Sequence, residues 1–222
     1  APTERVRLLW AGAFLLAVIM GAAGFLLALV YQQKVQAVTT ANYRANFDAL
    51  TGLSNRFYFS QRLTILIKEM RREKLDFAVF FIDIDHFKQV NDSLGHSAGD
   101  QLLIDFAARL QQSARDSDIV ARLGGDEFAI LLDGKIDHET ICRIAENIIN
   151  AMKTAFNIEG LNIASSLSIG IANYNHESIS ADQILIDADH AMYQAKLKGR
   201  NQYVFFEALE EQNKSTNVKL EY

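Results

Sequence analysis

The sequence predicts an α/β sandwich in which helices flank a mostly antiparallel sheet, preceded by one transmembrane helix. Three observations carry this prediction. The run Phe77–Ile84 is almost unbroken apolar, as in a central strand buried on both faces. Two β-rich runs meet at Gly124-Gly125, which is a strong signal for a two-residue hairpin turn. Residues 8–31 carry no charge, and at ~1.5 Å per residue they can cross a ~30 Å hydrocarbon core as a helix.

Length and composition limit the chain to one full-sized domain with an appendage. It has 222 residues, half of them hydrophobic, with one proline and one cysteine, Cys142. These counts exclude a disordered chain, a disulfide-rich secreted scaffold and a zinc site built from several cysteines. Four basic residues oppose one acidic residue in 1–46 (+3), whereas 18 oppose 26 in 47–222 (−8). This acidic bulk argues against a nucleic-acid polymer as the partner.

The uncharged run could alternatively be a signal peptide, because Arg5 and Arg7 precede it. The apolar region of a signal peptide has only ~7–15 residues, so the longer run favours a membrane helix. Lys34 and Arg44 follow the run, so charge does not settle its orientation. The predicted organisation is a flank at 1–7, the membrane helix at 8–31, a helical stalk or linker at 32–47, a folded domain at 48–206 and a polar tail at 207–222.

The folded domain shows helical and strand patterns in alternation. Apolar residues at helical spacing predict helices over 55–74, 98–113, 136–156 and 180–198. Besides 77–84, strands are predicted at 118–123, 127–132, 162–173 and 203–206. Gly199 stands where a glycine commonly ends a helix.

Asp83 is the most informative residue, because it places a carboxylate at the end of the most apolar strand. Asp85 follows on the same face. A buried carboxylate is costly unless it is paired or bound to a metal, although an Asp that caps a turn is the simpler alternative. Asp126 and Glu127 follow the Gly-Gly turn and reach the same sheet end if the hairpin packs beside 77–84. Hard oxygen ligands of this kind suit Mg²⁺.

Residues 48–206 resemble the GGDEF family of diguanylate cyclases. The signature turn is present as residues 124–128, Gly-Gly-Asp-Glu-Phe, and residues 48–56 look like the family's D-x-L-T-G-L-P-N-R motif with Ser54 for its common Pro. Further matches cover 81–100, the metal and guanine motifs, and 189–201, a phosphate motif. Several motifs in the right order make the resemblance specific. It implies the nucleotidyl-cyclase, polymerase palm-like fold.

The resemblance also implies metal-binding and catalytic residues. Asp83, the main-chain carbonyl of Ile84, Asp126 and Glu127 would hold Mg²⁺, with two ions expected per active site and Mn²⁺ as an alternative. Asp126 would also be the base for the attacking ribose hydroxyl. Asp126, Glu127 and Lys88 are the expected catalytic residues.

The same resemblance assigns the nucleotide contacts. The residues expected to bind GTP are Phe87, Asn91, His96, Asp100, Gly124, Gly125, Lys196 and Arg200. Asn91 and Asp100 would read the guanine edge, since a carboxylate accepts from donors that adenine lacks. Lys88, Lys196 and Arg200 would bind phosphates, and Lys196 and Arg200 share a face if the last helix extends that far. Arg115 and Asp118 match the R-x-x-D site at which the cyclic dinucleotide product inhibits.

The resemblance implies a diguanylate cyclase that condenses two GTP into cyclic di-GMP and two pyrophosphates across a homodimer. Because GTP is cytosolic, we expect the domain in the cytoplasm, anchored in the inner membrane by one helix. The alternative is a catalytically silent module that senses GTP or cyclic di-GMP and signals to a partner or a downstream phosphodiesterase domain. An adenine-using cyclase is disfavoured by Asp100. The chain begins at Ala1 without an initiator Met, which fits a fragment of a longer protein.

Overall fold

A computed structural model of the chain describes residues 2–73, 76–134, 136–174 and 180–209. The chain divides into two compact units, Ala1–Arg44 and Ala45–Tyr222. The predicted polar tail at 207–222 lies outside the described residues from 210 onward.

The described residues of the first unit lie within one helix, α1 (Pro2–Asn46), which covers the predicted membrane segment and the predicted stalk up to residue 46. Several of its apolar side chains are exposed, including Trp10, Met20 and Leu27. Among the described residues, no helix is both long enough and apolar enough to cross a membrane. The span expected at 8–31 therefore stays a prediction.

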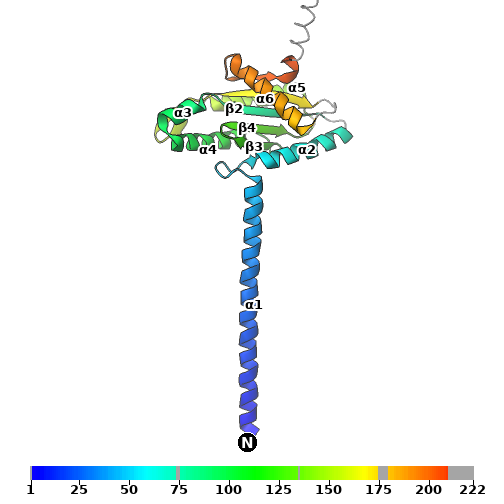
Figure 1. The fold of residues 1–222 in the computed structure, drawn as a ribbon, viewed down its shortest axis with the longest axis vertical. Coiled ribbons are helices and arrows are strands. Elements are labelled where there is room, and N and C mark those ends of the chain that lie inside the picture. The colour runs from blue at the N-terminus through cyan, green and yellow to red at the C-terminus, as the bar shows by residue number, and fades with distance from the viewer. Residues whose placement is uncertain (1, 74–75, 135, 175–179, 210–222) are drawn as a thin grey trace, which may run out of the picture. The chain divides into compact units, whose positions relative to one another are not determined.

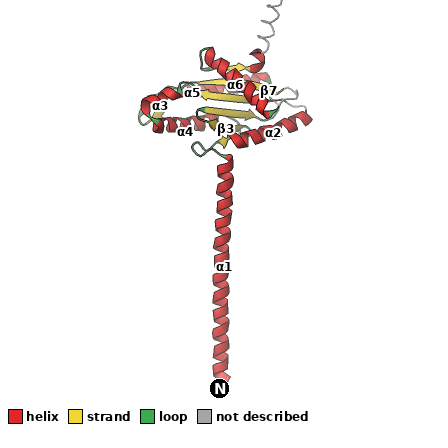
Figure 2. Cartoon of the chain, viewed as in Figure 1, coloured by secondary structure: helices red, strands yellow, loops and turns green. Residues whose placement is uncertain are grey.

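The second unit is a six-stranded sheet with helices on both faces (Figures 1 and 2). The strands of this sheet are β1 (Ser54–Asn55), β2 (Phe77–Ile84), β3 (Ile119–Gly124), β4 (Glu127–Leu132), β7 (Leu167–Tyr174) and β8 (Gln202–Phe205). Their order is β1-β3-β4-β2-β7-β8. The two outer pairs are parallel and the three inner pairs antiparallel, which confirms the predicted sheet.

In the described ranges of this unit, helices cover both faces of the sheet. They are α2 (Arg56–Glu73), α3 (Phe87–Leu94), α4 (His96–Ser113), α5 (His138–Met152) and α6 (Ala181–Leu197). A separate two-stranded sheet joins β5 (Phe156–Ile158) to β6 (Leu161–Ile163).

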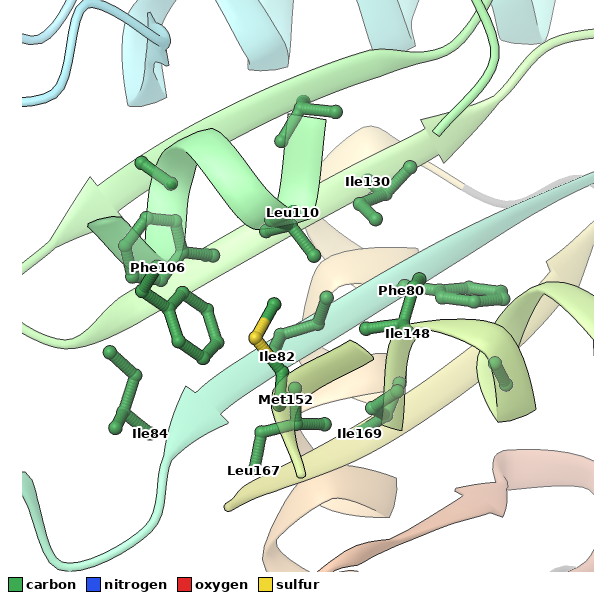
Figure 3. Packing of buried hydrophobic residues seen from close by; sticks show 14 of the residues in the cluster. Phe80, Ile82, Ile84, Phe106, Leu110, Ile130, Ile148, Met152, Leu167 and Ile169 are labelled. Carbon is green, nitrogen blue, oxygen red and sulfur yellow. The ribbon is translucent and has the colours of Figure 1, made fainter. Parts of the chain in front are cut away.

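The sheet has an apolar core on each face because successive residues of β2 point to opposite sides. Phe80 and Ile82 pack with α4 and α5 in a cluster that includes Phe106 and Ile148 (Figure 3). Residues 77, 79 and 81 pack with α2 and α6 in the other cluster. Burial on both faces explains why this strand reads as a continuous apolar run.

Three elements differ from the sequence prediction. The segment Phe87–Leu94 forms α3, for which the sequence predicted no helix. The helix expected to reach residue 156 ends at Met152, and Phe156 begins β5. The strand expected over 162–173 is divided, because residues 161–163 pair with β5 and only β7 joins the main sheet.

Candidate active site

Asp83 and Asp126 lie at the same end of the sheet because β2 and β4 are antiparallel neighbours. Asp83 pairs with Glu127, the first residue of β4. The N–H of Ile84 donates to the carbonyl of Asp126 at 3.3 Å. Asp83 is buried, with only 7% of the residue exposed. The hairpin therefore does pack beside the central strand, and it brings the second pair of acidic residues to this sheet end.

Asp83 is paired with a cation from α6. It follows residues 77, 79 and 81 on the face of β2 that packs against α6, where Lys196 Nζ lies 2.7 Å from Asp83 Oδ2. Burial raises the pKa of Asp83 to about 6 against the opposing effect of Lys196, and the Asp126 carboxylate adds to the rise. Lys196, expected on phosphate, is thus the counter-ion of a candidate metal ligand.

Glu127 lies among other charged groups at the start of β4. Partial burial raises its pKa, and so do the carboxylates of Asp189 and Asp126. Arg56 opposes this rise, because its Nη2 lies 3.2 Å from Glu127 Oε2. Asp189 is an exposed residue of α6.

The signature turn is a two-residue connection in which Gly124 pairs with Glu127, so Gly125 and Asp126 are its central residues. The prediction had placed Gly124 and Gly125 there. Gly125 has φ 53°, in the left-handed region that suits glycine. Arg122 donates from Nε and Nη2 to the carbonyl of Gly125 at 3.0 and 2.8 Å.

Asp85 has a structural role. Its carboxylate accepts from the hydroxyls of Ser166 at 2.6 Å and Ser168 at 2.8 Å, and from the N–H of Asn201 at 3.1 Å. These bonds join the end of β2 to the start of β7 and to the segment after α6. Asp85 is almost fully buried, and these donors satisfy its carboxylate oxygens.

A cavity of about 390 Å³ lies beside Asp83 and Asp126. Its lining includes seven residues expected in the site, namely Asp83, Ile84, Phe87, Lys88, Asp126, Lys196 and Arg200. Lys196 lies in α6, which ends at residue 197, and Arg200 follows in a left-handed conformation with φ 64°. The two therefore do not share a helix face, yet both reach this cavity.

The residues expected to read guanine lie on α3 and α4. Asn91 is half-buried in α3, whereas His96 and Asp100 are exposed in the first turns of α4. Gly99 permits close packing of the two helices, since a Cβ there would come 1.9 Å from Asn91 Oδ1. Asn91 therefore lies against the residue that precedes Asp100.

Arg115 and Asp118 form a tight turn before β3. The N–H of Arg115 donates to Asp118 Oδ2 at 2.9 Å, and the N–H of Asp118 donates to the carbonyl of Arg115 at 3.0 Å. Asp118 is 7% exposed, whereas Arg115 is exposed. The turn thus holds the carboxylate and presents the guanidinium to solvent.

The donor set for a metal is incomplete in the protein alone. Among the described residues, no three His, Cys, Asp or Glu side chains lie close enough together to hold an ion. The buried carboxylate of Asp83 and the nearby Asp126 still fit Mg²⁺, because that ion commonly uses one or two carboxylates with substrate phosphates. Ile84, whose main-chain carbonyl is the third expected ligand, lines the same cavity as these two carboxylates.

Comparison with known proteins identifies the family of the chain. Residues 45–202 match the family model described as diguanylate cyclase, GGDEF domain. The chain belongs to the GGDEF family. The diguanylate cyclase TpbB of Pseudomonas aeruginosa is 43% identical over 159 residues, which are 71% of this chain and 37% of that protein. The chain thus spans little more than a third of this curated relative.

Two solved structures share the GGDEF fold. The isolated GGDEF domain of TpbB from P. aeruginosa has a TM-score of 0.69 and 42% identity, covering 72% of this chain and 93% of that one. The coiled coil and GGDEF domain of DgcB from Caulobacter crescentus, in complex with c-di-GMP, has a TM-score of 0.74. It is 26% identical and covers 80% of this chain and 94% of that one.

Two residues near the GGDEF turn were not singled out from the sequence. Arg56 and Arg122 both contact the hairpin that carries Asp126. Arg56 is the last residue of the motif at 48–56, so the motif could have indicated it. Arg122 lies in the strand predicted at 118–123, where no sequence pattern distinguishes it.

Proposed function

We propose that this GGDEF domain is an active diguanylate cyclase that converts two GTP into cyclic di-GMP and two pyrophosphates. One observation carries the proposal. Asp83, Asp126 and three cationic side chains, those of Lys88, Lys196 and Arg200, line a single cavity. Carboxylates for metal and cations for phosphate, placed around one space, are what phosphoryl transfer requires.

The metal would be held by Asp83, Asp126 and the carbonyl of Ile84, with Glu127 beside them. When bound, Mg²⁺ supplies charge stabilisation for the entering and leaving oxygens of an in-line displacement. The proposal includes two ions per active site and allows Mn²⁺ as a substitute for Mg²⁺.

The protein groups have separate tasks in the reaction. Asp126 accepts the proton of the ribose 3′-hydroxyl, and the oxygen of that hydroxyl bonds to the α-phosphorus of the other GTP. The bond from that phosphorus to the pyrophosphate oxygen breaks. Lys88 and Arg200 are exposed cations that would hold the phosphates in line. Each domain supplies one GTP, so two domains must meet as a homodimer.

Asn91 and Asp100 would select guanine over adenine. The carboxylate of Asp100 accepts from the N1–H and the amino group of guanine, and adenine presents neither donor. Asn91 lies beside Gly99, so it reaches the same region between α3 and α4.

Membrane attachment and feedback complete the proposal. The uncharged sequence of residues 8–31 lies within the continuous helix α1 and would anchor the chain in the inner membrane, with the domain in the cytoplasm. The exposed Arg115 and the fixed carboxylate of Asp118 would bind cyclic di-GMP as an inhibitor.

Incubation of the chain with GTP and Mg²⁺, with chromatography of the products, tests the activity. We expect cyclic di-GMP and pyrophosphate at a ratio of one to two. Asp126→Ala should form neither, while Asp105→Ala, which removes only an exposed hydrogen bond with Gln101 on α4, should retain the wild-type rate. No product from the wild type would favour the silent sensor, and equal product from Asp126→Ala would exclude the assigned base.

A further inference from the structure

The first motif of the domain, residues 48–56, contributes no residue to the lining of the cavity beside Asp83. It is nevertheless joined to the GGDEF turn by two arginine side chains. One arginine, Arg56, belongs to the motif itself. The other, Arg122, lies on β3 and contacts Asp48. These contacts give the motif a structural connection to the catalytic residues.

Arg56 links the two arms of the GGDEF hairpin. Its Nε donates to the carbonyl of Leu123 on β3 at 3.0 Å, and its Nη2 lies 3.2 Å from Glu127 Oε2 on β4. The parallel pairing of Asn55 with Arg122 places Arg56 beside the hairpin. A guanidinium can hold a carbonyl and a carboxylate at once because its donors have a fixed fork geometry.

Arg122 holds the tip of the same hairpin. Two of its nitrogens donate to the carbonyl of Gly125, directly before Asp126, and its Nη1 lies 3.0 Å from Asp48 Oδ1. The Arg122 side chain is 12% exposed, so this ion pair is largely withdrawn from water. Asp48 is itself fixed, because its Oδ1 accepts from the N–H and hydroxyl of Thr51.

We propose that Arg56 and Arg122 are positioning residues that hold Glu127 and the backbone before Asp126 against residues 48–56. This inference rests on the proposed function for its kinetic consequence. A catalytic turn misplaced by a fraction of an ångström loses transition-state stabilisation, while groups that bind GTP elsewhere are unaffected. Displacement of residues 48–56 is therefore transmitted to the acidic residues of the turn.

Kinetics of Arg56→Gln and Arg56→Lys test the role of the fork. The Arg56 side chain is 56% exposed, so both variants should fold. We expect Arg56→Gln to lower kcat roughly ten- to a hundredfold with KM for GTP changed by less than about threefold. Arg56→Lys should recover only part of kcat, since an ammonium lacks the fork. Arg72→Gln, which loses an exposed ion pair with Glu73, is the matched control.

Amide hydrogen exchange provides a measurement that does not depend on turnover. In Arg56→Gln the amides of residues 123–127 should exchange about tenfold faster than in the wild type, while those of β2 stay unchanged. Asp48→Asn keeps an acceptor for Thr51 but weakens the pair with Arg122, and it should accelerate the same amides.

The outcomes separate this inference from the proposed function. Wild-type kcat in Arg56→Gln, or a rise in KM alone, would overturn it. Unchanged exchange at residues 123–127 in both variants would also overturn it. If the wild type makes no cyclic di-GMP, the proposed function fails, and faster exchange in the two variants still supports the positioning role.

Discussion

Lys196 Nζ lies 2.7 Å from Oδ2 of Asp83, so α6 supplies the counter-ion for the carboxylate near the end of the central strand β2. Both groups line the cavity that we assign to GTP and metal. A bound cation would compete with Lys196 for this carboxylate and leave the ammonium available to phosphate. The ammonium of Lys196 therefore balances the charge of the Asp83 carboxylate when no ligand is bound.

Removal of Lys196 should raise the pKa of Asp83. Burial already raises this pKa to about 6, and the lysine is the group that lowers it. In Lys196→Met the opposing cation is lost, so the titration midpoint should move to higher pH. Carboxyl ¹³C NMR in the presence of EDTA measures it, with Lys198→Met as the control. An unchanged midpoint would contradict the observed pairing.

Asp83 should also make the stability of the metal-free protein depend on pH. Its pKa is raised in the folded state, so its contribution is complete below the unfolded value and is lost as the pH rises through about 6. Asp83→Asn should remove a decline on the order of 2 kcal/mol between pH 4 and pH 7. Urea denaturation in EDTA at several pH values measures the slopes, and parallel curves for the two proteins would refute the assignment.

Gly99→Ala should weaken GTP binding. A Cβ at residue 99 would come 1.9 Å from Asn91 Oδ1 and 3.3 Å from Phe87, so the side chain of Asn91 must move. We expect the dissociation constant for GTP to rise about tenfold, equivalent to ~1.4 kcal/mol. Calorimetry with a non-hydrolysable GTP analogue measures it. Ser97→Ala, an exposed neighbour on α4, should bind as the wild type does.

Gly170→Ala should destabilise the domain. A Cβ on this residue of β7 would lie 1.9 Å from the carbonyl oxygen of Ala188 and 2.2 Å from the nitrogen of Met192, both in the backbone of α6. The helix would have to move away from the sheet, at a cost of about 3 kcal/mol. Urea denaturation measures the loss, and a change below about 1 kcal/mol would contradict this close packing.

Arg115→Ala should relieve inhibition by cyclic di-GMP. The substitution removes an exposed guanidinium but leaves the main-chain N–H that donates to Asp118 Oδ2. We expect the concentration for half-inhibition to rise at least about tenfold, because a guanidinium contact with phosphate is charge-assisted. Rates with added product, normalised to each variant's uninhibited rate, measure the effect. Equal half-inhibition would place the inhibitory site elsewhere.

The main strands could be predicted because their patterns reflect burial that depends on few partners. The run 77–84 is buried on both faces, and its apolar sequence shows this directly. The helix α3 was not predicted because it has eight residues, none of them fully buried. The division of residues 162–173 was also hidden, since alternation continues through Ile163 and Leu167 while the pairing partner changes.

The candidate site was predicted in its residue types, whereas its contacts depend on the fold. The resemblance indicated Lys196 and Arg200, but the end of α6 at residue 197 separates them from a common helix face. The ion pairs of Arg56 and Arg122 join residues that are 71 and 74 positions apart in the chain. No local pattern carries information about such distant partners.

Because Asp83 pairs with Glu127, the arrangement of the site depends on the pairing of β2 with β4. Asp83 is the next-to-last residue of β2, whereas Asp126 and Glu127 lie in the turn before β4 and at its first position, so these carboxylates approach one another only while the two strands remain paired. Any opening that separates the two strands would also separate these carboxylates. If the proposed function holds, a molecule that has lost this pairing should be inactive, and turnover would report only molecules whose central strands are paired.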